Sequence, residues 1–196
     1  LFAKILIDAT ELGDIAARVG VAYDIGMDSR KKYGEQIAPK KDNDIIQDLT
    51  YVMILKDYLK DMTIEKPKGY NPEIFYCSSE SDQCKMGEKM NRTLWPKDSL
   101  LSYGRLPNGK VMINWPINGN DYYVNSIEQS EEERQRSFEK AKLKSLQFLY
   151  YLQTELGFNT YGLADDEFPT DDGFPLIPYH RESRRIHGIT TLTVNH

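Results

Sequence analysis

Cysteine, histidine and long apolar runs are scarce in this sequence. Its 196 residues include two cysteines and three histidines, and no pair of Cys or His has the spacing of a zinc-binding motif. We therefore expect no metal site. No apolar stretch approaches the roughly 20 residues that a membrane-spanning helix needs, so we expect no membrane span. The apolar start, residues 1–7, is too short for a signal peptide.

Basic residues are also in short supply. The 25 Lys and Arg stand against 30 Asp and Glu, for a net charge of −5. Because a general nucleic-acid binder normally carries a basic excess, we expect no nucleic-acid partner. Hydrophobic residues make up 40% of the chain and charged residues 28%, which is typical of a protein that buries a core.

Cys77 and Cys84 flank a polar loop, residues 78–83. Two interpretations stay open, a pair of free thiols and a disulfide that closes this short loop. A disulfide would indicate an oxidising compartment. The sequence favours neither, so the compartment is open between the cytoplasm and an extracytoplasmic location.

The sequence begins with Leu rather than Met and stops after a strand-like segment. We therefore expect it to be an internal fragment of a longer polypeptide. The remainder of that polypeptide is then its expected protein partner.

Apolar periodicity predicts an α+β fold in which a mixed, mainly antiparallel sheet packs against one long helix. Ser130 and Glu133 form a capping box that opens this helix, and Gly157 stops it. A helix over residues 131–156 is about 39 Å long, enough to cross a sheet. Residues 49–55 are apolar on both alternating faces and predict a central strand.

The other expected elements are shorter. A strand at 4–7 leads into a helix at 11–19, with Gly20 as its stop. Residues 57–98 read as long loops with short strands, a length that is typical of a binding or lid segment. Residues 186–194 read as a closing strand.

A hairpin is expected from residues 110–115 and 121–126. The pair Asn118-Gly119 lies between them and supplies the positive φ that a tight turn requires.

The first candidate site is the turn Asp8-Ala9-Thr10, between the expected strand and helix. Unpaired N–H groups at a helix N-terminus attract phosphates and other anions. Small residues at Ala9 and Gly13 let the backbone approach a ligand. The alternative is an ordinary strand-to-helix turn capped by Asp8 or Thr10.

The segment Asp8-Ala9-Thr10-Glu11-Leu12-Gly13-Asp14 resembles the Asp-Ala-Thr motif of FAD-dependent oxidoreductases of the two-dinucleotide-binding-domain type. The commoner form is Asp-Ala-Thr-Gly-Asp-Gly-Asp; Glu11 and Leu12 replace the first Gly-Asp here. Some bacterial members are labelled xanthan lyases. Further segments resemble the same branch: Gln47–Tyr51, Asn114–Pro116, Gly119–Tyr123, Ala164–Gly173 and Arg181–Ile186.

The resemblance implies FAD as the cofactor. In that family the motif lies late in the FAD domain, so the implied cofactor-binding residues are Asp8, Ala9, Thr10, Gly13 and Asp14. The family's Gly-x-Gly-x-x-Gly loop, which holds the pyrophosphate, has no counterpart in this sequence. We therefore expect that the chain alone neither binds FAD appreciably nor is active.

The resemblance also implies a domain organisation. Residues 1–22 are a flank of the FAD-binding domain, residues 23–180 form a substrate domain, and residues 181–196 return toward the FAD domain as a strand.

The second candidate site is the charged run near the end, with Arg181, Arg184 and Arg185 as tentative catalytic residues beside His180. Arginine forks bind carboxylates through two parallel hydrogen bonds. In a flavoenzyme they would hold an anionic substrate or stabilise the reduced flavin. His180 is a candidate for proton transfer, because the pKa of histidine lies near neutrality.

The conformation of this run decides which side chains share a face. If it is extended, Ile186 joins the core on the face of His180 and Arg184, while Arg181 and Arg185 lie on the other face. The structural alternative is that the arginines pair with the acidic residues upstream, which are Asp165, Asp166, Asp171 and Asp172.

The third candidate site is an aromatic cluster of Trp115, Tyr122 and Tyr123 beside Asn120. Aromatic rings next to amide side chains resemble a carbohydrate platform, so these are tentative substrate-binding residues. The simpler interpretation is a strand that faces the core.

Together these patterns favour the substrate-side domain of an FAD-dependent oxidoreductase, which transfers hydride from a small organic or sugar-like substrate to FAD. The alternative is a polysaccharide (xanthan-type) lyase or a carbohydrate-binding module, in which Tyr or His acts as base and Arg or Asn neutralises a uronate carboxylate.

Overall fold

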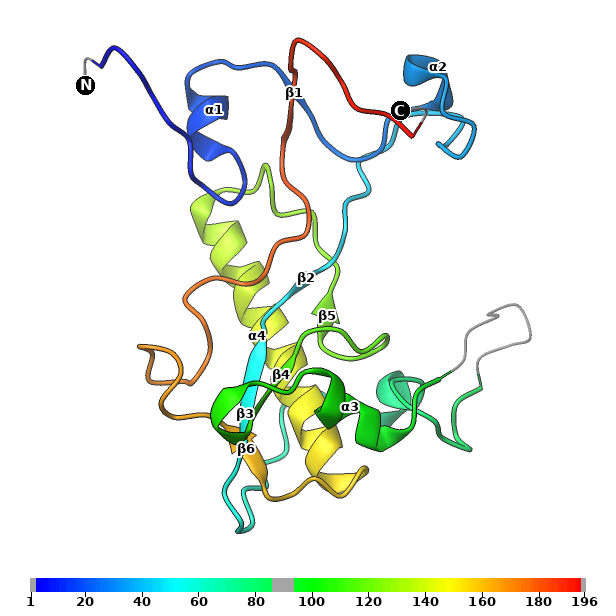
Figure 1. Cartoon of the computed structure of the whole chain (residues 1–196), viewed down its shortest axis with the longest axis vertical. Coiled ribbons are helices and arrows are strands. Elements are labelled where there is room, and N and C mark those ends of the chain that lie inside the picture. Colours follow the sequence, from blue (N-terminus) through cyan, green and yellow to red (C-terminus); the bar gives the residue numbers. More distant parts are fainter. Residues whose placement is uncertain (1–2, 86–93, 195–196) are drawn as a thin grey trace. The chain divides into compact units, whose positions relative to one another are not determined.

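The computed structural model describes residues 3–85 and 94–194 (Figure 1). The chain forms two compact units. Unit 1 comprises Leu1–Asp48, Tyr123–Glu131 and His180–His196, and unit 2 comprises Leu49–Tyr122 and Glu132–Tyr179. Helices and small antiparallel sheets are combined, which confirms the expected α+β class. Within the described ranges, no helix is both long and apolar enough to span a bilayer.

The main sheet of unit 2 is built around β3 (Met53–Asp57). Its antiparallel neighbours are β4 (Lys110–Ile113) and β6 (Tyr161–Leu163). Met53 and Leu55 on one face of β3 are completely buried, and Ile54 on the other face is 4% exposed, so this part of β3 is apolar and buried on both faces, as a central strand requires. The central strand expected at 49–55 is therefore confirmed in its second half.

The first half of that segment forms a separate strand. Leu49–Thr50 (β2) pairs antiparallel with Asp121–Tyr122 (β5) in a sheet of two strands. Thr50 also exchanges two backbone hydrogen bonds with Tyr179, of 2.8 and 3.1 Å.

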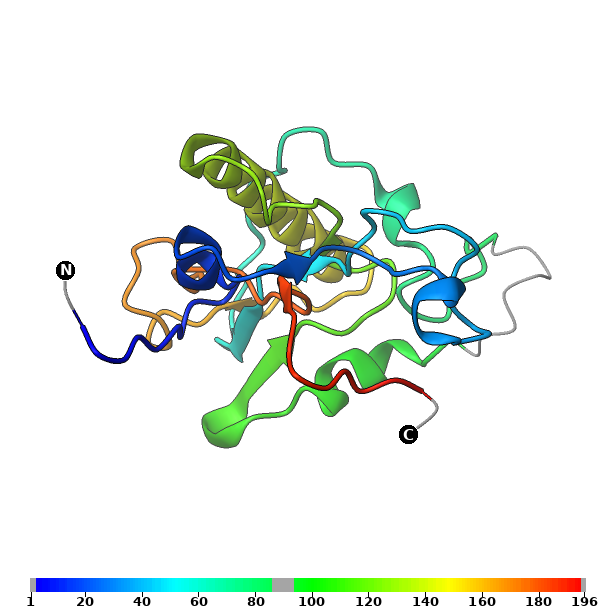
Figure 2. The ribbon, with the colours of Figure 1, turned by 90° about the horizontal axis from the view of Figure 1, so that it is seen from above.

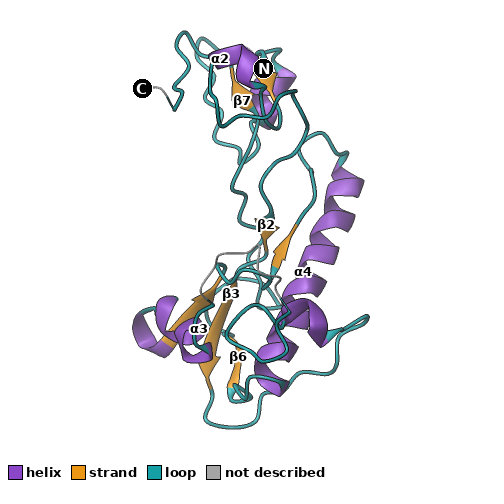
Figure 3. Cartoon of the chain, turned by 90° about the vertical axis from the view of Figure 1, so that its right-hand side faces the viewer, coloured by secondary structure: helices purple, strands orange, loops and turns teal. Residues whose placement is uncertain are grey.

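The long helix α4 runs from Glu131 to Thr154 and lies along the sheet of unit 2 (Figure 3). Gly157 follows it with a φ of 81°, so both the start after Ser130 and the stop before Gly157 are confirmed. Buried side chains recur every three or four residues, the period of a helix face. They include Phe138, Ala141, Ser145, Phe148, Leu149 and Leu152.

The expected hairpin of residues 110–115 and 121–126 is wrong. The turn is present, with Gly119 N–H donating to the Pro116 carbonyl over 2.9 Å, but β4 pairs with β3 and β5 with β2. Buried Asn120 explains the difference, since its Nδ2 donates to the carbonyls of Tyr51 and Ile113 over 3.0 and 3.2 Å. These bonds hold Asn120 against Tyr51, which lies between β2 and β3.

Unit 1 has short elements. Its sheet pairs β1 (Tyr23–Asp24) with β7 (Arg185–Ile186) in antiparallel fashion (Figure 2). Its helices are α1 (Asp14–Arg18) and α2 (Arg30–Tyr33). Buried Leu12, Ile46 and Ile127 form a small apolar cluster.

Three expectations for unit 1 are wrong. Residues 4–7 form no strand, and Ile5 and Ile7 are 80% and 81% exposed. The helix expected at 11–19 begins only at Asp14, after Gly13 with a φ of 69°. The closing strand is confined to β7, and Ile189 is fully exposed. Neither end segment has a neighbouring strand within the described residues on which to bury its apolar side chains.

In its described part, the irregular stretch 57–98 contains helical turns rather than the expected short strands. After β3 it has η1 (Pro72–Phe75) and the start of α3 (Lys97–Tyr103); η2 (Pro107–Gly109) follows. Residues 86–93 of this stretch lie outside the described ranges. Cys77 and Cys84 form a disulfide, which decides between the two interpretations of the cysteine pair.

Replacing Asn120 by Ala should destabilise unit 2 by about 1–3 kcal/mol. The Ile113 carbonyl loses the Asn120 donor, and the Tyr51 carbonyl keeps only the donor of Ser145 Oγ, at 2.8 Å. Urea unfolding followed by tryptophan fluorescence measures this, since Trp95 and Trp115 both lie in unit 2. Exposed Gln135 on α4 is the control, and Gln135→Ala should change stability by less than about 0.5 kcal/mol. Equal effects of the two substitutions would refute the role of Asn120.

Candidate functional site

The turn before α1 is closed by two side chains. The Asp8 carboxylate accepts hydrogen bonds from Thr10 N (2.8 Å), Thr10 Oγ1 (2.7 Å) and Ala16 N (2.7 Å). Thr10 Oγ1 in turn accepts from Asp14 N over 2.8 Å. The backbone N–H of Thr10 is the main reason why the pKa of Asp8 is lowered. Asp8 and Thr10 thus occupy the amides of Asp14 and Ala16 at the start of α1.

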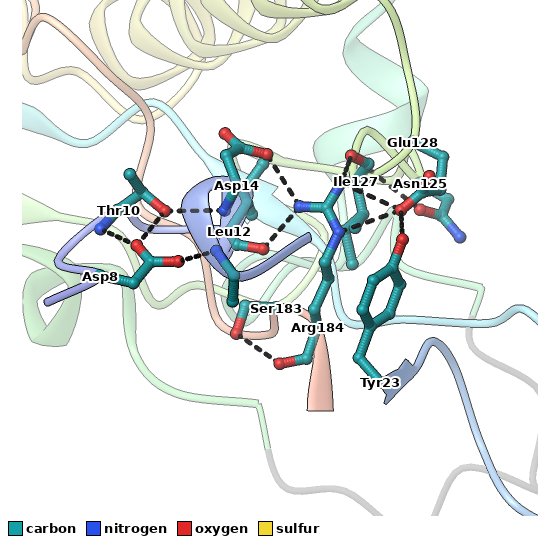
Figure 4. A network of polar contacts seen from close by, with 11 residues as sticks. Asp8, Thr10, Leu12, Asp14, Tyr23, Asn125, Ile127, Glu128, Ser183 and Arg184 are labelled. Atoms are coloured by element: carbon teal, nitrogen blue, oxygen red, sulfur yellow. Dashed lines mark hydrogen bonds and ion pairs between the residues drawn. The ribbon is translucent and has the colours of Figure 1, made fainter. Parts of the chain in front are cut away.

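Arg184 lies at the centre of the polar network in unit 1 (Figure 4). Nη1 donates to the Leu12 carbonyl (2.7 Å) and to Asp14 Oδ1 (2.8 Å). Nη2 donates to the Ile127 carbonyl (2.8 Å) and contacts Glu128 Oε1 (2.9 Å), to which Nε also donates (3.0 Å). All five N–H donors of a guanidinium are therefore engaged within the chain.

The environment of Arg184 keeps it charged. Its side chain is 6% exposed, and this burial acts to lower its pKa, but hydrogen bonds with Asp14, Tyr23 and Glu128 outweigh burial and raise the pKa. The guanidinium also lies over the Tyr23 ring, 5.2 Å from its centroid, at a cation–π distance.

Arg185 and His187 take part in a second network. Arg185 Nη1 donates to Asp28 Oδ2 and His187 Nε2 lies beside Asp24 Oδ2, both at 2.8 Å. Lys32 joins the two acids, with its Nζ 2.9 Å from Asp28 Oδ1 and 2.5 Å from Asp24 Oδ2. The hydrogen bond from Lys32 is the main cause of the lowered pKa of Asp24.

Arg181 and Glu182, which precede β7, bind the main chain of residues 47–48. Arg181 Nη1 donates to the Asp48 carbonyl over 2.9 Å, and Glu182 accepts from Gln47 N over 2.9 Å. His180 is half-buried.

Arg184 and Arg185 form ion pairs within unit 1, with Asp14, Glu128 and Asp28. The upstream acids are paired with lysines of unit 2: Asp165 with Lys56, Asp166 with Lys110, and Asp172 with Lys142.

The expected place of Ile186 in the core is also wrong. Arg184 is the buried member of that face, and Ile186 is 45% exposed. Because hydrogen-bond acceptors surround its donors, Arg184 can be buried although it is charged, whereas Ile186 stays partly exposed.

The aromatic candidates belong to different units and have different surroundings. Trp115 packs against Trp95 and Tyr103, with ring centroids 4.7 and 4.5 Å apart. Tyr122 is in β5, and Tyr123 is 53% exposed in unit 1. Asn120 is completely buried, where its Nδ2 supports the core.

Sequence reasoning missed the acidic and basic partners in these networks. Asp28 and Lys32 are four residues apart, a spacing that indicates an ion pair on a helical turn and that the sequence displays. Glu128 carries no such local signal, since Arg184 is 56 residues away in the chain, and the pairing of Asp24 with His187 spans 163 residues.

Comparison with known proteins identifies a family for this chain. A family model described as FAD dependent oxidoreductase matches residues 1–196. No curated protein and no solved structure matches the chain.

Replacing Arg184 by Lys should destabilise unit 1 by about 3 kcal/mol, because an ammonium cannot reach all the acceptors that the guanidinium fork joins. Hydrogen exchange of the amides of residues 12–17 measures this locally, since both tryptophans lie in unit 2. Exposed Arg18 is the control, and Arg18→Lys should leave the exchange unchanged. Unaltered protection in Arg184→Lys would contradict the central role of Arg184.

Replacing Thr10 by Val should raise the pKa of Asp8 toward its ordinary value of 3.8, because the hydroxyl donor is lost while the backbone donor of residue 10 remains. Since the folded pKa is lowered, the Asp8 contribution to stability is present above 3.8 and is lost as the pH falls through the folded pKa. A ¹³C NMR titration of the Asp8 carboxyl measures the shift. Thr170→Val in unit 2 is the control. An equal pKa of Asp8 in the wild type, Thr10→Val and Thr170→Val would contradict the role of the Thr10 hydroxyl.

Proposed function

We propose, from the premise that this chain belongs to the FAD-dependent oxidoreductase family, that it supplies the substrate-side part of a flavoprotein oxidoreductase. The proposed reaction is hydride transfer from a small organic or sugar-like substrate, and FAD, where bound, supplies the hydride acceptor.

The observation that supports this proposal most is the connection that Arg184 makes. The Asp8–Asp14 segment and the Arg181–Ile186 segment lie at opposite ends of the chain. Arg184 binds Leu12 and Asp14 directly, over 2.7 and 2.8 Å. The two segments that resemble the family most closely are therefore parts of a single folded unit, as they would be beside one cofactor.

The residues around α1 do not fit the pyrophosphate of FAD. Its first-turn amides at Asp14 and Ala16 are already bonded to Thr10 and Asp8, so they are not free to hold a phosphate. The sequence also contains no Gly-x-Gly-x-x-Gly segment. We therefore assign no pyrophosphate-binding loop to these 196 residues and derive no catalytic step through the flavin.

The engaged donors of Arg184 define its proposed role. Because all of them bind groups of this chain, Arg184 is a positioning residue that holds the turn of Asp8 and Thr10. Arg181, Arg185 and His180 stay the candidates for contact with substrate. We propose that residues 23–180 form the substrate domain, flanked by 1–22 and 181–196 on the FAD side.

One observation favours the second candidate function, carbohydrate binding. Trp95 and Tyr103 are 42% and 61% exposed although they pack on each other at 5.2 Å. An exposed aromatic surface of this kind suits the apolar face of a sugar ring, and sugar binding is compatible with an oxidoreductase or with a lyase.

The natural polypeptide that carries this sequence should contain flavin after incubation with FAD, and its visible absorbance should bleach anaerobically when a substrate is oxidised. Residues 1–196 alone should show no appreciable FAD binding by titration calorimetry, because the pyrophosphate loop is lacking. Arg184→Lys should lower flavin retention, and Arg105→Lys in unit 2 should not.

Absence of flavin from the natural polypeptide would refute the oxidoreductase proposal. Formation of an unsaturated uronate product without bleaching would instead support the lyase. Tight FAD binding by residues 1–196 would show that the chain holds the cofactor by a route other than a pyrophosphate loop.

A further inference from the structure

Unit 1 contains a cleft of about 700 Å³, a size that suits a small organic ligand. Its walls come from β1 and the following loop, from α2, from residues 35–39, and from β7 with the segment that follows it. All of these belong to unit 1. The cleft is thus a property of one folded unit.

The polar wall of the cleft is the chain of ion pairs that runs through Arg185, Asp28, Lys32, Asp24 and His187. Two acids there face two permanent cations, and Glu35 adds another acid to the lining. The three acids outnumber the two permanent cations, so the wall repels a dianion more strongly than a ligand with one negative charge. The attraction for such a ligand comes from the unbonded donors of Arg185.

Arg185 has hydrogen-bonding capacity left over. Nη1 is bonded to Asp28, whereas Nε and Nη2 are shielded from solvent and have no hydrogen-bond partner within the described residues. Nε and Nη2 form one edge of the guanidinium, the edge that donates two parallel hydrogen bonds to a carboxylate. A buried donor without an acceptor is unusual in a folded protein and calls for an explanation.

The remaining lining is apolar and unusually open. Ile37 and Leu192 are 84% and 86% exposed, and Ile186, at 45%, lies beside Arg185 on β7. A ligand with an apolar body next to its acid group would cover these side chains while its carboxylate meets Arg185.

We propose that this cleft binds a small monocarboxylic acid with an apolar body, and that the Arg185 side chain, which is 39% exposed, turns its Nε and Nη2 edge toward the carboxylate on binding. Arg184, the residue just before β7, donates to Leu12 and Asp14, so the carboxylate site is distinct from the turn of Asp8 and Thr10. The inference stands without the proposed redox reaction, because its readout is binding to the chain itself.

The test uses benzoate as probe and neutral benzamide as its matched analogue, with ¹H–¹⁵N NMR titration of the whole chain. Benzoate should shift the amides of residues 185–188 saturably, and benzamide and inorganic phosphate should not. Arg185→Lys keeps the charge but lacks the fork, so it should bind benzoate about tenfold more weakly or worse. Arg105→Lys in unit 2 is the control and should bind like the wild type.

Three results would overturn the proposal: no saturable shift with benzoate, equal shifts with benzamide or phosphate, or unchanged affinity in a folded Arg185→Lys protein. The comparison of benzoate with benzamide is made on the wild type, so it decides the matter even where Arg185→Lys does not fold. A flavin-free natural polypeptide would refute the redox reaction and leave this site intact.

Discussion

The buried guanidinium of Arg184 is the constraint on which unit 1 depends. A charge in a protein interior is tolerated only when hydrogen-bonding partners replace its hydration. Those partners are Leu12, Asp14, Ile127 and Glu128, which come from two distant parts of the chain. The apolar cluster of unit 1, which includes Leu12 and Ile127, is small. The hydrogen bonds and ion pairs of Arg184 therefore hold together segments that a larger apolar core would otherwise stabilise.

The elements that the sequence predicts well are those whose signals are local. The capping residues and the stop at Gly157 define α4, and the double-faced apolar run defines β3, without reference to other parts of the chain. Strand pairing is different, because it depends on which groups meet in three dimensions. The turn at Pro116–Gly119 forms as predicted, yet one buried amide, Asn120, determines that its flanking strands pair elsewhere.

The candidate site shows the same limit. The sequence identifies the arginines and the turn of Asp8 and Thr10, and its structural alternative for the arginines is pairing with the nearest acids in the chain. The acids they use are Asp14, Asp28 and Glu128, whereas the acids just upstream bind lysines of unit 2. Proximity in sequence is a poor guide to ion pairing, because the desolvated geometry of the fold decides which pairs form.

The difference between Arg184 and Arg185 follows from the geometry of a strand. Successive side chains of an extended segment point to opposite faces, so Arg184, just before β7, and Arg185, its first residue, meet different surroundings. Arg184 finds acceptors for every donor and becomes part of the framework. Arg185 finds one carboxylate and keeps an unbonded edge in a residue that lines a cleft. The donors of Arg184 are already bonded within the chain and cannot bind a ligand. Arg185, with its unbonded donors, is therefore the arginine with which unit 1 can recognise a ligand.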